Sequence, residues 1–171
     1  MKGGNEMNHN DRLTRLRYAL DLKDPEMVEI FELGGYTISR RDVQAMLRKT
    51  DESTEENEFQ NDYELECTDE MFERFLNGFI TSRRGAKDGP EPALELNYKN
   101  ANNLFLKKVK IALTLTSDDI MDLLAKSDVQ ISKGELSAVL RKEGHRNYKP
   151  CGDRYIRNFL RGLAMEFREE E

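Results

Sequence analysis

The sequence predicts an all-α protein, a tandem duplication of a roughly four-helix repeat whose two copies pack with pseudo-two-fold symmetry. Three observations support this prediction: apolar residues recur at helical spacing, helix-capping residues precede the apolar segments, and the chain repeats itself. The 171 residues are 37% hydrophobic and 35% charged. This composition allows a packed core beneath a heavily charged surface and argues against a chain that is disordered throughout.

The repeat is visible when the chain is aligned with itself. A shift of 93 residues aligns the stretch that begins at Asn10 with the stretch that begins at Asn103. After a nine-residue length change the match resumes at a shift of 84, where both copies contain the pattern C-x-D-x5-F-L-x-G, starting at Cys67 and Cys151. Identities that fall in the same order in both halves are poorly explained by chance, so the chain is a duplication.

The duplication and the changes in composition divide the chain into five parts. They are a flexible N-terminus (1–9), a first repeat (10–82) with an acidic insert (50–66), a linker (83–101), a second repeat (102–168) and an acidic tail (169–171). The linker is assigned from its glycines and from Pro90 and Pro92, which interrupt regular structure.

Each copy is expected to hold four helices. They are a first helix near 11–22 and 103–115, a second capped by Asp24 and Thr116, a third capped by Ser39 and Ser132, and a fourth that follows Cys67 and Cys151. The fourth helices carry Gly78 and Gly162 in their middle, where Gly costs about 1 kcal/mol relative to Ala. A glycine placed there twice predicts a close helix contact, for which the interface between the copies is a candidate.

Two pairs of matching segments indicate a family. "ISRRDVQAMLRK" pairs with "ISKGELSAVLRK", and "ECTDEMFERFLNGF" pairs with "PCGDRYIRNFLRGL". Together with the stretch "RKEGHRNYKPCGD", they make residues 10–167 resemble the bacterial family called domain of unknown function 1456. The resemblance implies a bacterial, cytoplasmic, two-copy helical protein whose activity is not established, and it adds no catalytic residues.

Charge is uneven between the copies. Residues 1–92 hold 13 basic against 21 acidic residues, whereas residues 93–171 hold 14 against 12. The basic residues of the second copy form a candidate surface for a polyanion or a partner, to which His145 and Tyr148 add hydrogen-bonding and stacking groups. The candidate residues are Lys133, Arg141, Lys142, His145, Arg146, Tyr148, Lys149, Arg154, Arg157 and Arg161.

Three interpretations of this candidate surface stay open. It could neutralise the phosphates of RNA or DNA. It could be the solvated side of an amphipathic helix, which is the commonest role of a charge run. It could also contact the acidic segment Asp51–Glu70, within the chain or in another subunit, or a partner protein.

A helix-turn-helix is a further possibility for the second and third helices of each copy. The five residues between Leu33 and Ser39 exceed the three or four usual for that motif. The outward face of the third helix would offer mostly small side chains, which do not reach base edges: Gly134, Ser137, Ala138 and Arg141. A helical hairpin that serves packing is the simpler explanation.

The cysteines and histidines do not form a convincing metal or catalytic set. A zinc site normally needs four ligands, and the chain has only two cysteines and two histidines, with His9 in the flexible N-terminus. Cys67 and Cys151 each precede a capping residue and are expected to serve packing. We therefore expect no metal and no cofactor.

The sequence thus favours a non-enzymatic binding or regulatory module that acts through protein interaction, with an unknown partner or by self-association. Nucleic-acid binding through the second copy is the alternative. The polar first residues and the lack of a long apolar run predict a cytoplasmic protein with no membrane partner.

Overall fold

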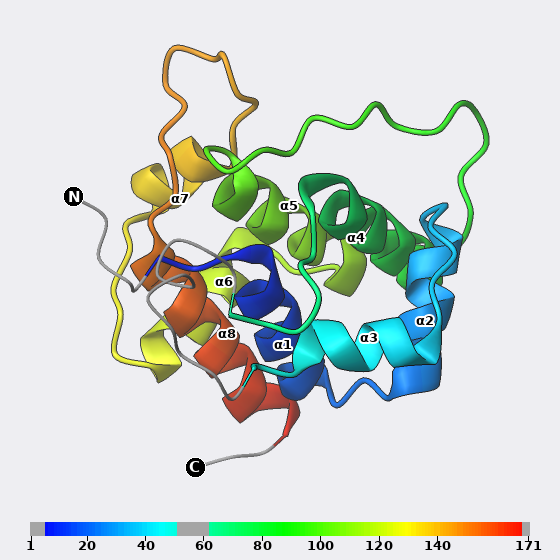
Figure 1. Cartoon of the computed structure of the whole chain (residues 1–171). Helices are drawn as coiled ribbons and strands as arrows, with labels where there is room; N and C mark the ends of the chain where they lie inside the picture. The colour runs from blue at the N-terminus through cyan, green and yellow to red at the C-terminus, as the bar shows by residue number, and fades with distance from the viewer. Residues whose placement is uncertain (1–5, 51–61, 169–171) are drawn as a thin grey trace.

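The computed structural model describes residues 6–50 and 62–168, and this part of the chain folds into eight α-helices with no β-strand (Figure 1). The helices are α1 (His9–Leu20), α2 (Asp24–Leu33), α3 (Arg40–Leu47), α4 (Asp69–Arg84), α5 (Ala101–Leu113), α6 (Ser117–Lys126), α7 (Lys133–Leu140) and α8 (Asp153–Phe167). Helices α1–α4 form the first copy and α5–α8 the second. The predicted all-α tandem duplication is confirmed.

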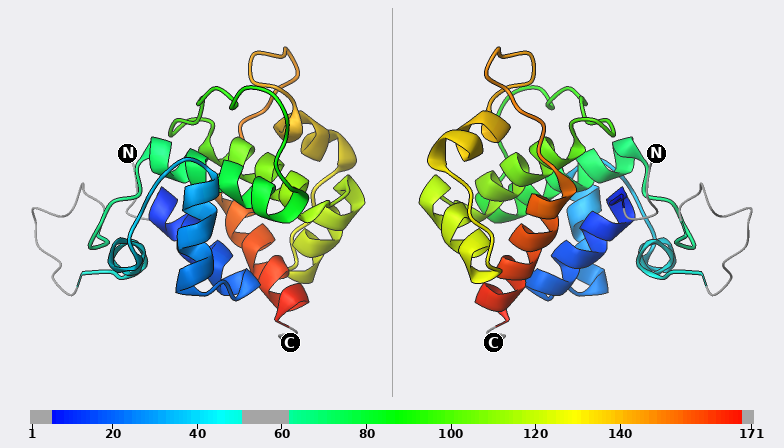
Figure 2. Two further views of the ribbon diagram at one scale, coloured as in Figure 1. Left: turned by 90° about the vertical axis from the view of Figure 1, so that its right-hand side faces the viewer. Right: turned by 90° about the vertical axis from the view of Figure 1, so that its left-hand side faces the viewer.

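The packing of the helices is symmetric between the copies. Within each copy the fourth helix packs on the second, α4 on α2 and α8 on α6. Between the copies α4 packs on α5 and α8 packs on α1, which is the same pair of positions taken in opposite directions (Figure 2). This reciprocal exchange is what a pseudo-two-fold axis produces. One continuous core crosses the axis, where the rings of Phe72 and Phe105 stack 5.9 Å apart.

Helix starts follow the predicted caps in most places. The side chains of Ser39, Thr68, Thr116 and Ser132 each accept a hydrogen bond from a backbone N–H in the first turn. In α2 the cap is Lys23, one residue before the predicted Asp24, and Asp24 is the first helical residue.

The first helix of each copy is shifted relative to the prediction. Helix α1 begins at His9 because Asn8 and Asp11 form a reciprocal capping box. It ends at Leu20 because Asp21 adopts the left-handed conformation, with φ of 53°. Thr114 ends α5 in the same way, with φ of 56°.

Two buried asparagines at matching positions tie each copy together. The Asn10 amide donates to the carbonyls of Met46 and Leu65, and its oxygen accepts from the N–H of Cys67. Asn103 occupies the same place in the second copy, with the end of α7, the following loop and Cys151 as its partners. Each asparagine satisfies backbone groups at the end of the third helix and at the entry to the fourth.

The mid-helix glycines mark close contacts, as predicted, but these contacts lie within each copy. A Cβ on Gly78 would lie 1.8 Å from the carbonyl oxygen of Ile30 in α2. A Cβ on Gly162 would lie 1.9 Å from the carbonyl oxygen of Leu123 in α6. The glycines therefore allow the fourth helix to cross the second, and the interface between the copies, which was the candidate place, does not depend on them.

The linker is anchored to α4. One carboxylate oxygen of the buried Glu73 accepts hydrogen bonds from the backbone N–H groups of both Glu95 and Leu96, each at 2.8 Å. The Leu96 side chain is buried, and the amide of Asn100 donates to the Glu95 carbonyl. The last part of the linker therefore lies as an extended strap beside α4 and α5.

Candidate functional site

The residues predicted as a binding surface lie in two separate places. Arg141, Lys142 and Tyr148 line a groove of about 260 Å³, together with Lys107 and Lys108 of α5. Arg154, Arg157 and Arg161 lie on α8, which packs against α1 and α6. The predicted surface is thus a groove beside the linker and a row of arginines on a different helix pair.

The remaining candidates lie at the periphery of the second copy. Lys133 pairs with Asp118, and Lys149 pairs with Glu135, both at the protein surface. His145 and Arg146 are exposed in the loop between α7 and α8. Surface ion pairs of this kind contribute little, about 0–1 kcal/mol each.

The described part of the acidic segment contacts the first copy. Glu64 pairs with Arg48, Asp62 with Lys49, and Glu70 with Arg74. Each of these cations belongs to the first copy itself. Residues 51–61, which hold the rest of the predicted acidic contact with the second copy, lie outside the described residues.

Tyr148, predicted as a base-stacking residue, is half-buried in the groove. Its burial raises the pKa of the phenol, and nearby Glu143 adds to the effect. The groove is also lined by the apolar side chains of Ile80, Leu104 and Ile111. Much of the Tyr148 ring therefore lies in the groove and is not exposed for stacking on a base.

The arginine row lies along one side of α8, and Arg168 at the end of that helix contacts α1. We define the α1–α8 face as the exposed side of this helix pair that carries the residues Arg15, Tyr18, Arg154, Arg157, Arg161 and Arg168. Arg168 fixes one end, because its guanidinium donates to the Tyr18 carbonyl, approaches the Asp21 carboxylate to 3.4 Å and stacks 4.3 Å above the Tyr18 ring. Arg84 holds the matching place in the first copy and donates to Thr114.

The matching pair α4–α5 has a different charge pattern. There, Lys108 of α5 donates to Asn77 and approaches the carboxylate of Glu73 to 3.8 Å. The repeat offsets of 93 and 84 place Arg15, Arg157 and Arg161 at the positions of Lys108, Glu73 and Asn77. One copy of this helix pair therefore has a cation opposite an acid and an amide, and the other has arginines at all three positions.

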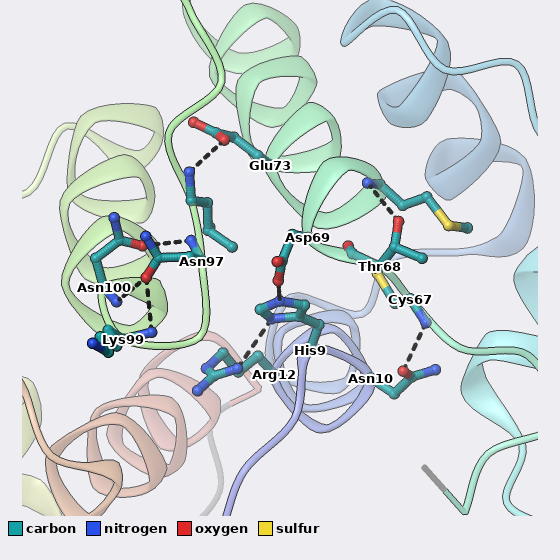
Figure 3. A network of polar contacts seen from close by, with 12 residues as sticks. His9, Asn10, Arg12, Cys67, Thr68, Asp69, Glu73, Asn97, Lys99 and Asn100 are labelled. Atoms are coloured by element: carbon teal, nitrogen blue, oxygen red, sulfur yellow. Dashed lines mark hydrogen bonds and ion pairs between the residues drawn. The ribbon is translucent and has the colours of Figure 1, made fainter. Parts of the chain in front are cut away.

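A second site lies where the first turns of α1, α4, α5 and α8 converge. It is a polar pocket of about 740 Å³, which we call the axial pocket because it joins equivalent elements of both copies. Asp69 and Asp153, the paired acids of the two repeats, both line it, as do both cysteines. His9 and Arg12 enter it from α1 (Figure 3).

A chain of polar contacts crosses the axial pocket. The Asp69 carboxylate lies 2.6 Å from His9 Nε2, and His9 Nδ1 lies 3.1 Å from Arg12 Nη1. Arg12 Nε donates to Asn102 Oδ1, and the Asn102 amide donates to Asp153. The chain links the fourth helix of the first copy to the fourth helix of the second.

The repeat alignment contains a signal for this chain of contacts. His9 falls within the predicted flexible N-terminus, whereas the structure buries it against Phe72, with ring centroids 4.7 Å apart. The offset of 93 residues pairs His9 with Asn102, directly before the matched pair Asn10 and Asn103. His9 and Asn102 make equivalent hydrogen bonds, since each donates to the aspartate that begins the fourth helix of its own copy, Asp69 or Asp153.

The protonation of His9 follows from its partners. Arg12 can only donate, so His9 Nδ1 accepts, and the ring proton on Nε2 is donated to Asp69. Burial lowers the pKa of His9, and the hydrogen bond to Asp69 opposes this only in part. His9 is therefore a neutral connecting residue with both nitrogens engaged.

The two thiols are also unsuited to nucleophilic chemistry. Burial raises the pKa of Cys67 strongly and raises that of Cys151 to about 12. Because the thiolate is the nucleophile, we expect both thiols to be protonated and unreactive at neutral pH. In the described residues, no group of three His, Cys, Asp or Glu side chains is placed to hold a metal ion.

No helix in the described ranges has both the length and the apolar character needed to cross a bilayer.

Comparisons with known proteins agree with the duplicated fold. The family described as "Protein of unknown function (DUF1456)" matches residues 9–85 and again residues 102–169, once in each copy. The chain is 39% identical over 155 residues to the uncharacterized protein YehS of Escherichia coli (strain K12), an alignment that covers 91% of this chain and 93% of YehS. No solved structure matches the chain. With both copies matched and a relative aligned over nearly its whole length, the chain belongs to the DUF1456 family.

Proposed function

We propose that the protein is a non-enzymatic binding module that acts through contact with another protein, and that the α1–α8 face is its contact surface. The supporting observation is the composition of that face. Arg154 and Arg161 are exposed, and Tyr18, which contacts Arg168 at the end of the same face, is 49% exposed. Arginine and tyrosine are enriched at protein interfaces and among the residues that dominate their binding energy.

The non-enzymatic part of the proposal is supported by the axial pocket. General acid–base or nucleophilic catalysis needs a group that can take up a proton or attack a substrate. The nitrogens of His9 are both occupied, and the thiols of Cys67 and Cys151 are held protonated by burial. The pocket is better suited to hold the two copies in register than to perform chemistry.

Nucleic-acid binding stays the less favoured alternative. It drew its support from one continuous basic surface with Tyr148 as a stacking residue. In the structure the basic residues lie on two separate surfaces, and Tyr148 lines a groove with aliphatic neighbours.

Photo-crosslinking in the native cell tests the proposal. Tyr18→p-benzoylphenylalanine places an aromatic crosslinker on the α1–α8 face, and Ile111→p-benzoylphenylalanine is the matched control at the equivalent position of the second copy. The two side chains are similarly exposed, at 49% and 44%. We expect a defined protein adduct from position 18 that is absent from position 111, and that Arg161→Glu abolishes.

The crosslinked protein is then purified and titrated against the full chain. Saturable binding that Arg161→Glu weakens is the expected result. Equal labelling from positions 18 and 111, or adducts that contain only RNA or DNA, would contradict the proposed protein contact.

A further inference from the structure

We infer that the α1–α8 face binds an extended acidic segment of a partner protein, laid along the helix pair as the linker is laid along α4 and α5. This inference rests on the proposed function, because it assigns the class of partner to the same face. It is drawn from a comparison of the two equivalent helix pairs, because the α4–α5 pair has a bound polypeptide segment.

The bound segment is the strap at the end of the linker. Its consecutive N–H groups, those of Glu95 and Leu96, both donate to one oxygen of Glu73. The Leu96 side chain is 7% exposed and belongs to the common core. The α4–α5 pair therefore holds an extended chain by two kinds of contact: a charged side chain that binds backbone groups, and an apolar residue that is buried.

The α1–α8 pair is the repeat equivalent of α4–α5 and differs from it in charge at the position that binds the strap. Arg157 replaces the strap-binding Glu73, and a guanidinium donates hydrogen bonds where a carboxylate accepts them. A segment on this face is therefore held by its carbonyl oxygens and by acidic side chains. Paired guanidinium–carboxylate hydrogen bonds are the strongest that such a segment can make here.

The spacing of the arginines fits an extended chain. Arg154 and Arg161 are seven residues apart on one face of α8, which corresponds to about 10 Å along the helix, with Arg157 between them. In an extended chain, every second side chain points to the same side and recurs about every 7 Å. Acidic residues at alternate positions of an extended chain can therefore reach along the row. The steps between the arginines, about 4.5 and 6 Å, would suit a helix with one acid per turn equally well, so the extended form is inferred from the strap on α4–α5 and not from this spacing.

The far end of the face has an aromatic contact. Tyr18 is held under the Arg168 guanidinium, 4.3 Å away, and half of its surface is open. An apolar residue next to the acidic stretch could pack on the Tyr18 ring. This would repeat on the α1–α8 pair the combination of charge and apolar burial that Leu96 and Glu73 provide on α4–α5.

A titration of the full chain with short peptides tests the inference. The probe is a fluorescein-labelled ten-residue peptide in which Glu alternates with Thr and which ends in Leu, and binding is followed by fluorescence anisotropy. We expect saturable binding at low ionic strength that weakens at high salt, since contacts between exposed charges are screened. The same peptide with Gln in place of Glu should not bind.

Matched charge reversals locate the binding face. The double variant Arg154→Glu, Arg161→Glu reverses two exposed charges of the α1–α8 face. It should weaken the affinity for the peptide by about ten-fold or more, since like charges then face the peptide carboxylates. Lys142→Glu with Arg146→Glu makes the same change in net charge in the exposed α7–α8 loop and should change binding by less than about two-fold. Equal losses from both double variants would overturn the inference, because only net charge would then matter.

Two other occupants are distinguished in the same assay. A labelled oligothymidine that binds more tightly than the peptide, and is lost in the Arg154→Glu, Arg161→Glu variant, would overturn both the inference and the proposed function. A peptide with the sequence of residues 51–61 tests the chain's own acidic segment. Binding of that peptide alone would assign the face to a contact of the chain with itself, and the inferred partner would be wrong.

The crosslinking and the peptide titration together separate the inferred acidic partner from the proposed protein contact. If position 18 crosslinks a protein but no acidic peptide binds, the face contacts a protein by another mode, and only the inference is overturned. If the peptide binds but position 18 crosslinks no protein in the cell, the peptide-binding chemistry stands and the proposed function is contradicted.

Discussion

Replacement of Asn103 by alanine should remove a large share of the stability of the protein. Its side chain makes three hydrogen bonds, to the carbonyls of Val139 and Lys149 at 2.9 and 2.8 Å and from the N–H of Cys151 at 3.0 Å. Asn103→Ala leaves these backbone groups without their partner. Each buried group left unsatisfied costs about 1–3 kcal/mol, so we expect a loss of about 3–5 kcal/mol.

Urea unfolding measures this loss. A typical domain is stable by about 5–15 kcal/mol, so the midpoint of unfolding should fall by about a fifth or more while the slope stays the same. Asn147→Ala, in the exposed α7–α8 loop, is the control and should change stability by less than about 0.5 kcal/mol. A loss below about 1 kcal/mol for Asn103→Ala would refute the account of the buried asparagine.

The equivalent variant in the first copy makes the test sharper. Asn10→Ala removes the same three kinds of hydrogen bond, with lengths of 2.8–2.9 Å. Since the two asparagines do equivalent work, the two losses should agree within about 1 kcal/mol, which is the usual spread for such substitutions. A large loss in one copy and none in the other would refute the equivalence.

Three further predictions concern the helix crossing, the axial pocket and the thiols. Gly162→Ala should lower the stability of the protein by about 3 kcal/mol or prevent folding, because the added Cβ meets the backbone of α6. Gly134→Ala, where the nearest atom is 4.0 Å away, should leave thermal unfolding unchanged. A Gly162→Ala variant as stable as the wild type would contradict the close crossing of α8 and α6. The pKa of His9 is lowered in the folded state, so the unfolded chain takes up the proton first and stability should fall as the pH drops below about 6.5. Urea midpoints measured over a pH series should show a shallower decline for His9→Asn. An unchanged decline would contradict the buried, neutral state of His9. Cys67 and Cys151 should resist a thiol-reactive dye at neutral pH until denaturant is added, and fast labelling of the native protein would show that they are not buried.

The sequence was most informative where local rules determine the structure. Ser39, Thr68, Thr116 and Ser132 could be assigned as caps because an N-cap is recognised from a few neighbouring residues. The duplication added the pairing of elements, because one copy serves as a control for the other. The fold class and the start of most helices were therefore predictable.

The candidate site was less predictable because burial of polar residues depends on distant partners. Glu73 falls on the polar side of α4 by helical spacing, yet the strap covers it and makes it the anchor of the linker. His9 precedes the first apolar residue of α1, and its burial depends on Phe72 and Asp69, about 60 residues away along the chain. Gly162 indicated a close contact, but only the packing of α8 on α6 identified the partner helix.

NMR of the isotopically labelled full chain can show directly whether the α1–α8 face is the binding surface. The alternating Glu–Thr peptide is added stepwise, and the backbone amide shifts are followed residue by residue. We expect shifts that cluster along α1 and α8, with Arg157 and Tyr18 among the most affected, and none along the strap-covered α4–α5 pair. Shifts confined to the loop from Arg141 to Lys149, or spread over every basic residue of the surface, would contradict this assignment of the binding surface.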